Sequence, residues 1–373
     1  AGCLTAPISI SPPSSSSFTS STPNPTQPPP TPLITCSLAF FDPTAAAVFR
    51  SSIPGRTEVQ VGRSPGARRA SMPQAALDPS ASVDWEDVWS RSAGAYTLPE
   101  ELETLRKRAD DVHTIVCLTD NAPQGLMSAL SAFPNASKLG LIASSTPFVT
   151  GRPFTLMHND AVLSSGAVGL ALFKPPRPAA TTAFPGLTAL TEELTVTRSE
   201  GNLIQELDKA NPSRLLLAAI QTRGIVGEAA KEHEFYVGVR AGGKTVQVHH
   251  ILSGDPSRGT IALESEVAPA EGSVVQLFHG PRHGAPAPAL PSPSSLAGLT
   301  GPGKRLSFIT APRDHPVSPN SDSESAVDVR VLDNVFLAAS ENGFLLGRNG
   351  DGEKEKEKVW TCTTRWIASL LWP

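Results

Sequence analysis

The sequence predicts a fold of the α/β to α+β class, with a mixed sheet and flanking helices in the first half and an antiparallel meander with insertions in the second half. Three observations predict it. Helix and strand signals alternate from residue 97 to residue 143, which is the pattern of a parallel β-α-β unit. Short strand signals with a two-residue period then follow one another over 235–278. Pro-rich segments at 281–303 and 312–326 interrupt this second half and read as surface insertions.

The first half opens with the β-α-β pattern. Residues 97–100, Thr-Leu-Pro-Glu, form a capping box, in which side chains at both ends satisfy free backbone N–H groups of a helix start. The apolar run 113–118 predicts a strand. A second helix is expected over 120–133, and the apolar run 139–143 predicts a second strand parallel to the first.

Shorter signals fill the middle of the chain. Residues 161–173 and 193–197 read as strands, and 202–207 reads as a short helix with its large aliphatic side chains on one face. Asn211 followed by Pro212 predicts a helix start, since asparagine caps free N–H groups and proline fits the first helical position.

The second half alternates in the manner of strands. Gly-rich turns separate the strand signals, so an antiparallel meander is expected. Two later stretches, 329–332 and 335–346, are expected to return to the sheet. The strand signals of the meander are 235–240, 245–252, 260–264 and 274–278.

Three parts are expected along the chain. Residues 1–95 are predicted to be mostly disordered because they are rich in Ser, Pro and Arg, with a strand allowed only at 36–41. The α/β part covers 96–222. The last part covers 223–373 and contains disordered insertions at about 281–327.

Composition excludes several function classes. The net charge of −4 provides no overall basic field, so nucleic-acid binding is not expected. No apolar run approaches the roughly 18 residues of a membrane span. The four cysteines are scattered, which argues against a disulfide framework or a zinc site. A cytoplasmic location is expected, and a mitochondrial one stays open because residues 1–77 hold five arginines and two acidic residues.

The sequence contains none of the common catalytic or metal-binding motifs. The chain contains no G-x-S-x-G, Walker-type, G-x-G-x-x-G or H-E-x-x-H pattern, so no catalytic residue, cofactor or metal is predicted. His279 and His283 are four residues apart, but Gly280 and Pro281 prevent the helix that would bring them onto one face.

The most informative segment is GLIASSTPFVTGRPFTL, residues 140–156. Here a buried strand ends in Ser144, Ser145 and Thr146, and ligands of open α/β sheets bind beyond the carboxyl ends of strands. The hydroxyl groups are suited to a small polar group, and Arg152 is suited to a carboxylate. These four residues are the predicted ligand site; an ordinary Ser/Thr turn with a surface arginine is the alternative.

Several segments together resemble the FIST domain family of intracellular sensory modules. Residues 140–156, SSGAVGLALF at 164–173 and LTVTRSEGNLIQELD at 194–208 resemble its N-terminal half. Residues 234–267 and EGSVVQLFH at 271–279 resemble its C-terminal half. In these terms, residues 96–222 are the N-terminal-like part and 223–373 the C-terminal-like part.

The resemblance implies a sensor of small molecules such as amino acids, acting on a protein signalling partner, with no catalytic residues to carry over. Two alternatives stay open. One is an enzyme that acts on a small amino-acid-like substrate, and the other is a protein-interaction scaffold.

Overall fold

The fold is mostly β-sheet, with several mixed sheets. Among the described residues 47% are in strands and 11% in helices. The expected helix-flanked sheet of the first half is therefore wrong. The computed structural model describes residues 1–10, 31–52, 100–184, 186–225, 227, 231–255, 259–265, 267–281, 303–311, 331–347, 359–362 and 367–373.

The helix signals of the first half are real but short. Helices α2 (Glu100–Arg106) and α3 (Gln124–Leu130) have seven residues each, and α4 (Pro147–Thr150) has four. Leu102 and Leu130 are fully buried in one core cluster with residues of the neighbouring sheet. Helices of this length cover only a small part of a sheet face.

A six-stranded sheet contains the predicted β-α-β unit. Its strands β5 and β6 are parallel, with Cys117 opposite Gly140, as the alternating pattern predicts. All six residues of β5 are buried: Ile115 and Cys117 face the helices, and Val116 belongs to the opposite core cluster. The strand order is β21 (Trp360–Cys362), β20 (Phe344–Gly347), β6 (Ser137–Ile142), β5 (Thr114–Thr119), β9 (Ala167–Leu172) and β4 (Ala46–Ser51).

Strand β20 comes from the last part of the chain. It pairs antiparallel with β6, with Phe344 opposite Leu141. The predicted stretch 335–346 thus forms two strands, separated by a turn at Asn342 and Gly343, where Gly343 has a φ of +86°. Residues 331 and 332, expected to start another strand, are not in one.

The N-terminal region contains more structure than the sequence indicated. Residues 36–41 form no strand, and β4 at 46–51 joins the six-stranded sheet instead. Packing of Phe49 explains the position of β4. The Phe49 side chain is buried, and its ring lies directly against Gly169, where an added Cβ would be 2.3 Å from the ring. Residues 11–30 and 53–99 lie outside the described residues.

The first ten residues add to two small sheets. Strand β1 (Gly2–Cys3) pairs with β7 (Leu156–His158), which pairs with β8 (Ala161–Leu163). Strand β2 (Ile8–Ile10) pairs with β3 (Thr31–Leu33). The single strand expected over 161–173 is split into β8 and β9 by a turn.

A four-stranded sheet lies beside the first one. Its order is β10 (Ala179–Ala183), β22 (Ile367–Leu371), β18 (Arg305–Thr310) and β19 (Val335–Ser340). Strands β18 and β19 are parallel.

The predicted meander is confirmed and belongs to a closed barrel. Strand β17 pairs with β12 on one side and also with β14, so that six strands form a ring in the order β12, β13, β16, β15, β14, β17. Strand β11 (Thr188–Ala189) pairs antiparallel with β17, with Thr188 opposite His279. The bounds are β12 (Leu194–Glu200), β13 (Leu203–Leu207), β14 (His233–Ala241), β15 (Lys244–Asp255), β16 (Thr260–Leu263) and β17 (Val274–Pro281).

Aliphatic side chains fill the barrel. Val196, Val237, Leu263 and Leu277 belong to its core cluster, together with Leu216 of helix α5 (Pro212–Thr222). The expected helix at 202–207 is wrong, because these residues are β13. Cross-strand pairing with β12 and β16 outweighs the helical spacing of so short a run.

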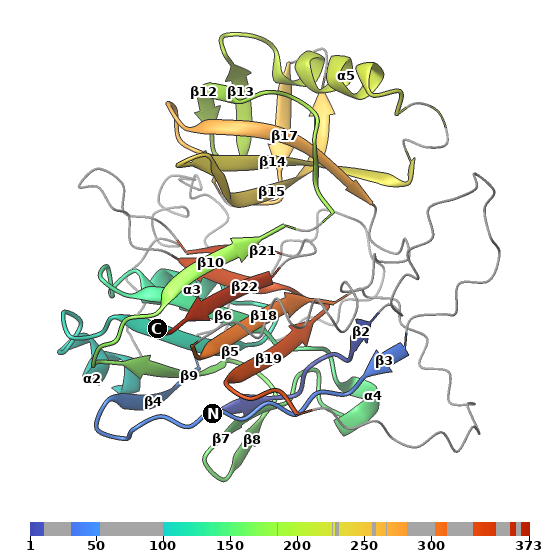
Figure 1. Ribbon diagram of the computed structural model, residues 1–373. Coiled ribbons are helices and arrows are strands. Elements are labelled where there is room, and N and C mark those ends of the chain that lie inside the picture. Colours follow the sequence, from blue (N-terminus) through green and yellow to red (C-terminus); the bar gives the residue numbers. More distant parts are fainter. Residues whose placement is uncertain are drawn as a thin grey trace, which may run out of the picture.

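Helix α5 begins as predicted. The Asn211 side chain accepts a hydrogen bond from the Arg214 N–H at 3.0 Å, and Pro212 occupies the first turn. In Figure 1, α5 lies at the end of the barrel farthest from the other sheets. The outer face of the barrel contributes Tyr236 and Phe278 to a core cluster that also holds Phe308 of β18.

Candidate functional site

The predicted site lies at the carboxyl end of β6, where a second loop meets it. Ser145 follows the strand, and its N–H donates to Glu341 Oε1 at 2.7 Å. Asn342 Nδ2 donates to the Ala143 carbonyl at 2.9 Å and lies 3.4 Å from Ser145 Oγ. The loop after β6 and the turn between β19 and β20 therefore form one polar surface.

Strand β5 ends at the same edge. Asp120 follows it directly, and its two oxygens accept hydrogen bonds from Gly166 N at 2.6 Å and Ala122 N at 3.0 Å. Both carboxylate oxygens of Asp120 thus bind backbone N–H groups of neighbouring loops. Asp120 stabilises this edge of the sheet, and its oxygens are already used in these hydrogen bonds.

Two of the predicted hydroxyl groups are buried. Ser144 is 5% exposed, and its Oγ lies 3.5 Å from the Ala339 carbonyl. Thr146 is 4% exposed, donates to the Arg152 carbonyl at 3.0 Å, and lies 2.8 Å from Thr155 Oγ1. These hydroxyl groups hold the loop around α4 in place, and Ser145 is the exposed one of the three.

Arg152 is exposed and turns toward β9. Its Nη1 donates to Ser164 Oγ at 2.8 Å. The structure thus brings the Arg152 backbone to Thr146, while its guanidinium contacts the turn after β8. Gly151 makes this course possible, since the residue that ends α4 has a φ of +72°, a conformation that glycine adopts without strain.

Helix α4, beside the site, presents apolar side chains to solvent. Phe148 is 102% exposed and Val149 is 77% exposed. Side chains of this size are normally covered, and two adjacent ones form a small apolar surface next to Ser145 and Arg152.

Sequence reasoning missed Glu341 and Asn342. A signal for them exists, because Asn342-Gly343 stands between two apolar runs, and this dipeptide is typical of a tight turn. The turn itself was therefore predictable, whereas its position against Ser145 depends on a pairing between strands that are about 200 residues apart in sequence.

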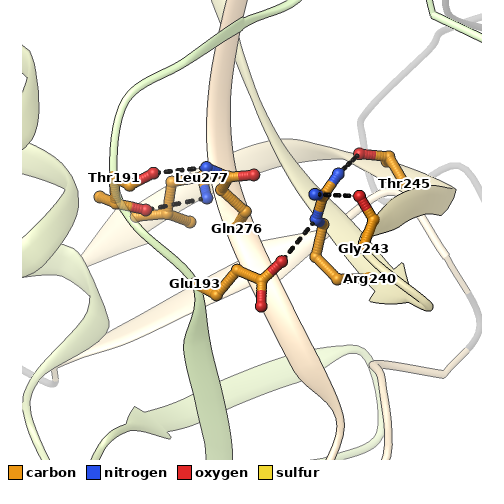
Figure 2. A network of polar contacts seen from close by, with 7 residues as sticks. All are labelled: Thr191, Glu193, Arg240, Gly243, Thr245, Gln276 and Leu277. Carbon is orange, nitrogen blue, oxygen red and sulfur yellow. Dashed lines mark hydrogen bonds and ion pairs between the residues drawn. The ribbon is translucent and has the colours of Figure 1, made fainter.

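A second polar network lies on the barrel (Figure 2). Arg240 donates from Nε to Glu193 Oε1 at 3.0 Å, from Nη1 to Thr245 Oγ1 at 2.7 Å and from Nη2 to the Gly243 carbonyl at 2.6 Å. Every guanidinium nitrogen has a protein partner, so this arginine fixes the barrel and is not available to a ligand.

Figure 2 also shows hydrogen bonds between β17 and Thr191, which lies in the segment between β11 and β12. Gln276 Nε2 donates to the Thr191 carbonyl at 2.6 Å, and Leu277 N donates to Thr191 Oγ1 at 3.2 Å. Together with Glu193 and Arg240, these contacts fasten the segment between β11 and β12 to β14 and β17.

Comparison with known proteins finds one family model that matches part of the chain. The model of the FIST N domain matches residues 41–210. No curated protein matches the chain. The matched span runs from the residues before β4 to the residues just after β13, and it includes all four predicted site residues. The resemblance of 234–279 to the C-terminal half of the family stays a prediction.

Proposed function

We propose that the chain, whose residues 41–210 match the FIST N domain, binds a small polar ligand, such as an amino acid, beside β6. Domains of this family are generally sensory. Ser145 and Arg152 are the two exposed residues of the predicted site. Glu341 and Asn342 extend it. A carboxylate of the ligand would meet Arg152, and an ammonium group would meet Glu341.

One observation carries this proposal. The Ser145 N–H, the Glu341 carboxylate and the Asn342 amide meet at the carboxyl end of a strand in a parallel pair. Such edges are where α/β sheets hold ligands. The buried hydroxyl groups of Ser144 and Thr146 would then act as supports for the loop. In this proposal a protein partner reads the liganded state, and the protein works in the cytoplasm.

A thermal-shift screen of the full chain with amino acids and small carboxylates tests the proposal. A ligand at a hundred times its dissociation constant adds about 2.7 kcal/mol to the stability of the folded state, which raises the unfolding midpoint. Arg152→Ala and Ser145→Ala should weaken the response. Arg198→Ala, at an exposed arginine on β12, serves as the matched control.

The outcome separates sensor from enzyme. A compound that stabilises the wild type and is recovered unchanged supports sensing. Recovery of a product by mass spectrometry supports the enzyme instead. A response that survives Arg152→Ala and Ser145→Ala contradicts the site.

A protein-interaction scaffold is the second candidate. The exposure of Phe148 and Val149 favours it, because such a surface gains free energy when a protein covers it. Phe148→Ser should then abolish partner binding and leave any small-molecule response intact.

A further inference from the structure

Two histidines meet across the strands that close the barrel. His279 lies opposite Phe235 in the pairing of β17 with β14, and His233 is two residues before Phe235, so both histidines are on the same face. Their Nδ1 atoms are 3.2 Å apart. The rings meet edge to face, with centroids 4.9 Å apart.

This separation matches that of two ligands on one metal ion. Imidazole nitrogens at about 2.0–2.1 Å from a tetrahedral Zn²⁺ are about 3.3 Å apart. Without a metal, the same contact is an N–H···N hydrogen bond from one neutral ring to the other. With a metal, both rings carry their proton on Nε2, and both Nδ1 lone pairs converge on the ion.

We propose that His233 and His279 form a two-histidine site for a divalent ion of the zinc, nickel or copper class. Imidazole nitrogen favours these ions, whereas Mg²⁺ and Ca²⁺ prefer oxygen ligands. Within the described part of the chain, no group of three or more His, Cys, Asp or Glu side chains is placed to hold a metal. Water completes the coordination of this pair.

The surroundings allow an ion to enter. Both histidines are half-buried, so solvent reaches them. The Arg223 guanidinium, fixed by a 2.9 Å bond to the Ala189 carbonyl, opposes the ion by charge repulsion.

The position gives the ion a structural effect. In Figure 1, β14 and β17 run side by side across the barrel, and their pairing is the one that closes the ring. An ion bound to a histidine of each strand stabilises the pairing of β14 with β17. Because the ion binds the folded barrel, it raises the unfolding midpoint in proportion to its occupancy.

Calorimetric titration of the metal-free, untagged full chain with Zn²⁺ tests the site. His233→Gln and His279→Gln should each weaken binding at least tenfold. His158→Gln, at another half-buried histidine on β7, should leave it unchanged. Mg²⁺ at the same concentrations should release no heat. Equal Zn²⁺ binding by all four proteins, as an exposed thiol such as Cys36 would give, overturns the proposal.

Two further measurements remain decisive if a histidine variant folds poorly. Arg223→Gln should tighten Zn²⁺ binding several-fold at low salt and less at high salt, because it removes a nearby positive charge. In the wild type, long-range ¹H–¹⁵N spectra should show Zn²⁺ shifting the nitrogen signals of two histidines. Unchanged affinity in Arg223→Gln, or signals that do not move, contradicts the site.

Discussion

The Ser145 N–H donates to the Glu341 carboxylate at 2.7 Å, although the two residues are 196 positions apart. The contact ties the loop after β6 to the turn before β20. It makes the polar edge of the six-stranded sheet a joint product of the middle and the end of the chain.

Asn342 should contribute measurably to stability at this junction. Its Nδ2 donates to the Ala143 carbonyl at 2.9 Å in a partly buried position. Asn342→Ala should lower the free energy of unfolding by about 1 kcal/mol, the usual net value of one such bond. Urea denaturation measures the change, with Gln221→Ala at an exposed position of α5 as the control. Equal losses in the two variants would show that the bond contributes nothing specific.

Gly140 should not tolerate a side chain. A Cβ at this position would lie 2.6 Å from Cys117 Sγ and 2.6 Å from the Leu345 side chain, in a region with no space to give. Gly140→Ala should therefore destabilise the protein by about 1–3 kcal/mol. At Gly2 the nearest atom would be 3.5 Å away, so Gly2→Ala should be close to neutral in the same thermal melts.

The capping bond of α5 can be tested by a pair of variants. Asn211→Ala removes the acceptor for the Arg214 N–H and should cost about 1 kcal/mol. Asn211→Ser retains an acceptor of similar reach and should recover most of that stability. If both variants lose the same amount, the side chain acts through packing and not through the cap.

Stability should fall as the pH drops below about 6.5. Burial lowers the pKa of His249 from 6.5 to about 4, so between these values the unfolded chain binds a proton that the folded protein excludes. The stabilisation is fully present above pH 6.5 and is lost as the pH falls toward 4, by on the order of 3 kcal/mol. The lowered pKa of His279 acts in the same direction.

Urea titrations at a series of pH values measure this effect. His249→Leu should reduce the slope of stability against pH between 6.5 and 4. Gln221→Leu, at an exposed position of α5 without a titratable group, should leave the slope as it is in the wild type. A slope that His249→Leu does not change would assign the acid sensitivity to other groups.

The sequence predicted the local elements better than the way they combine. Strands β5 and β6, the α5 start and the meander were predictable, since each rests on a local pattern of apolar residues, caps and turns. The helical spacing of Leu203, Ile204 and Leu207 predicts a helix over 202–207. In the structure they are β13, where Ile204 pairs with Ile261 in a strand far along the chain.

Long-range pairing also limited prediction of the site. The hydroxyl-rich segment at 144–146 was found from its position after a buried strand. That Ser144 and Thr146 are buried, and that Glu341 joins Ser145, depends on β20 pairing with β6, which no local pattern indicates. The closed barrel was equally hidden, because closure depends on β14 meeting β17.

The pairing of β6 with β20 also sets an order of events during synthesis. When residue 142 leaves the ribosome, the strand that will cover the free edge of β6 is still about 200 residues from being made. Until then, the buried residues Leu139 and Leu141 lack their neighbour Phe344. Contacts this distant in sequence form late, and the intermediate that waits for them exposes strand edges to other chains. Cells that make this protein should therefore accumulate it best when chaperones are abundant.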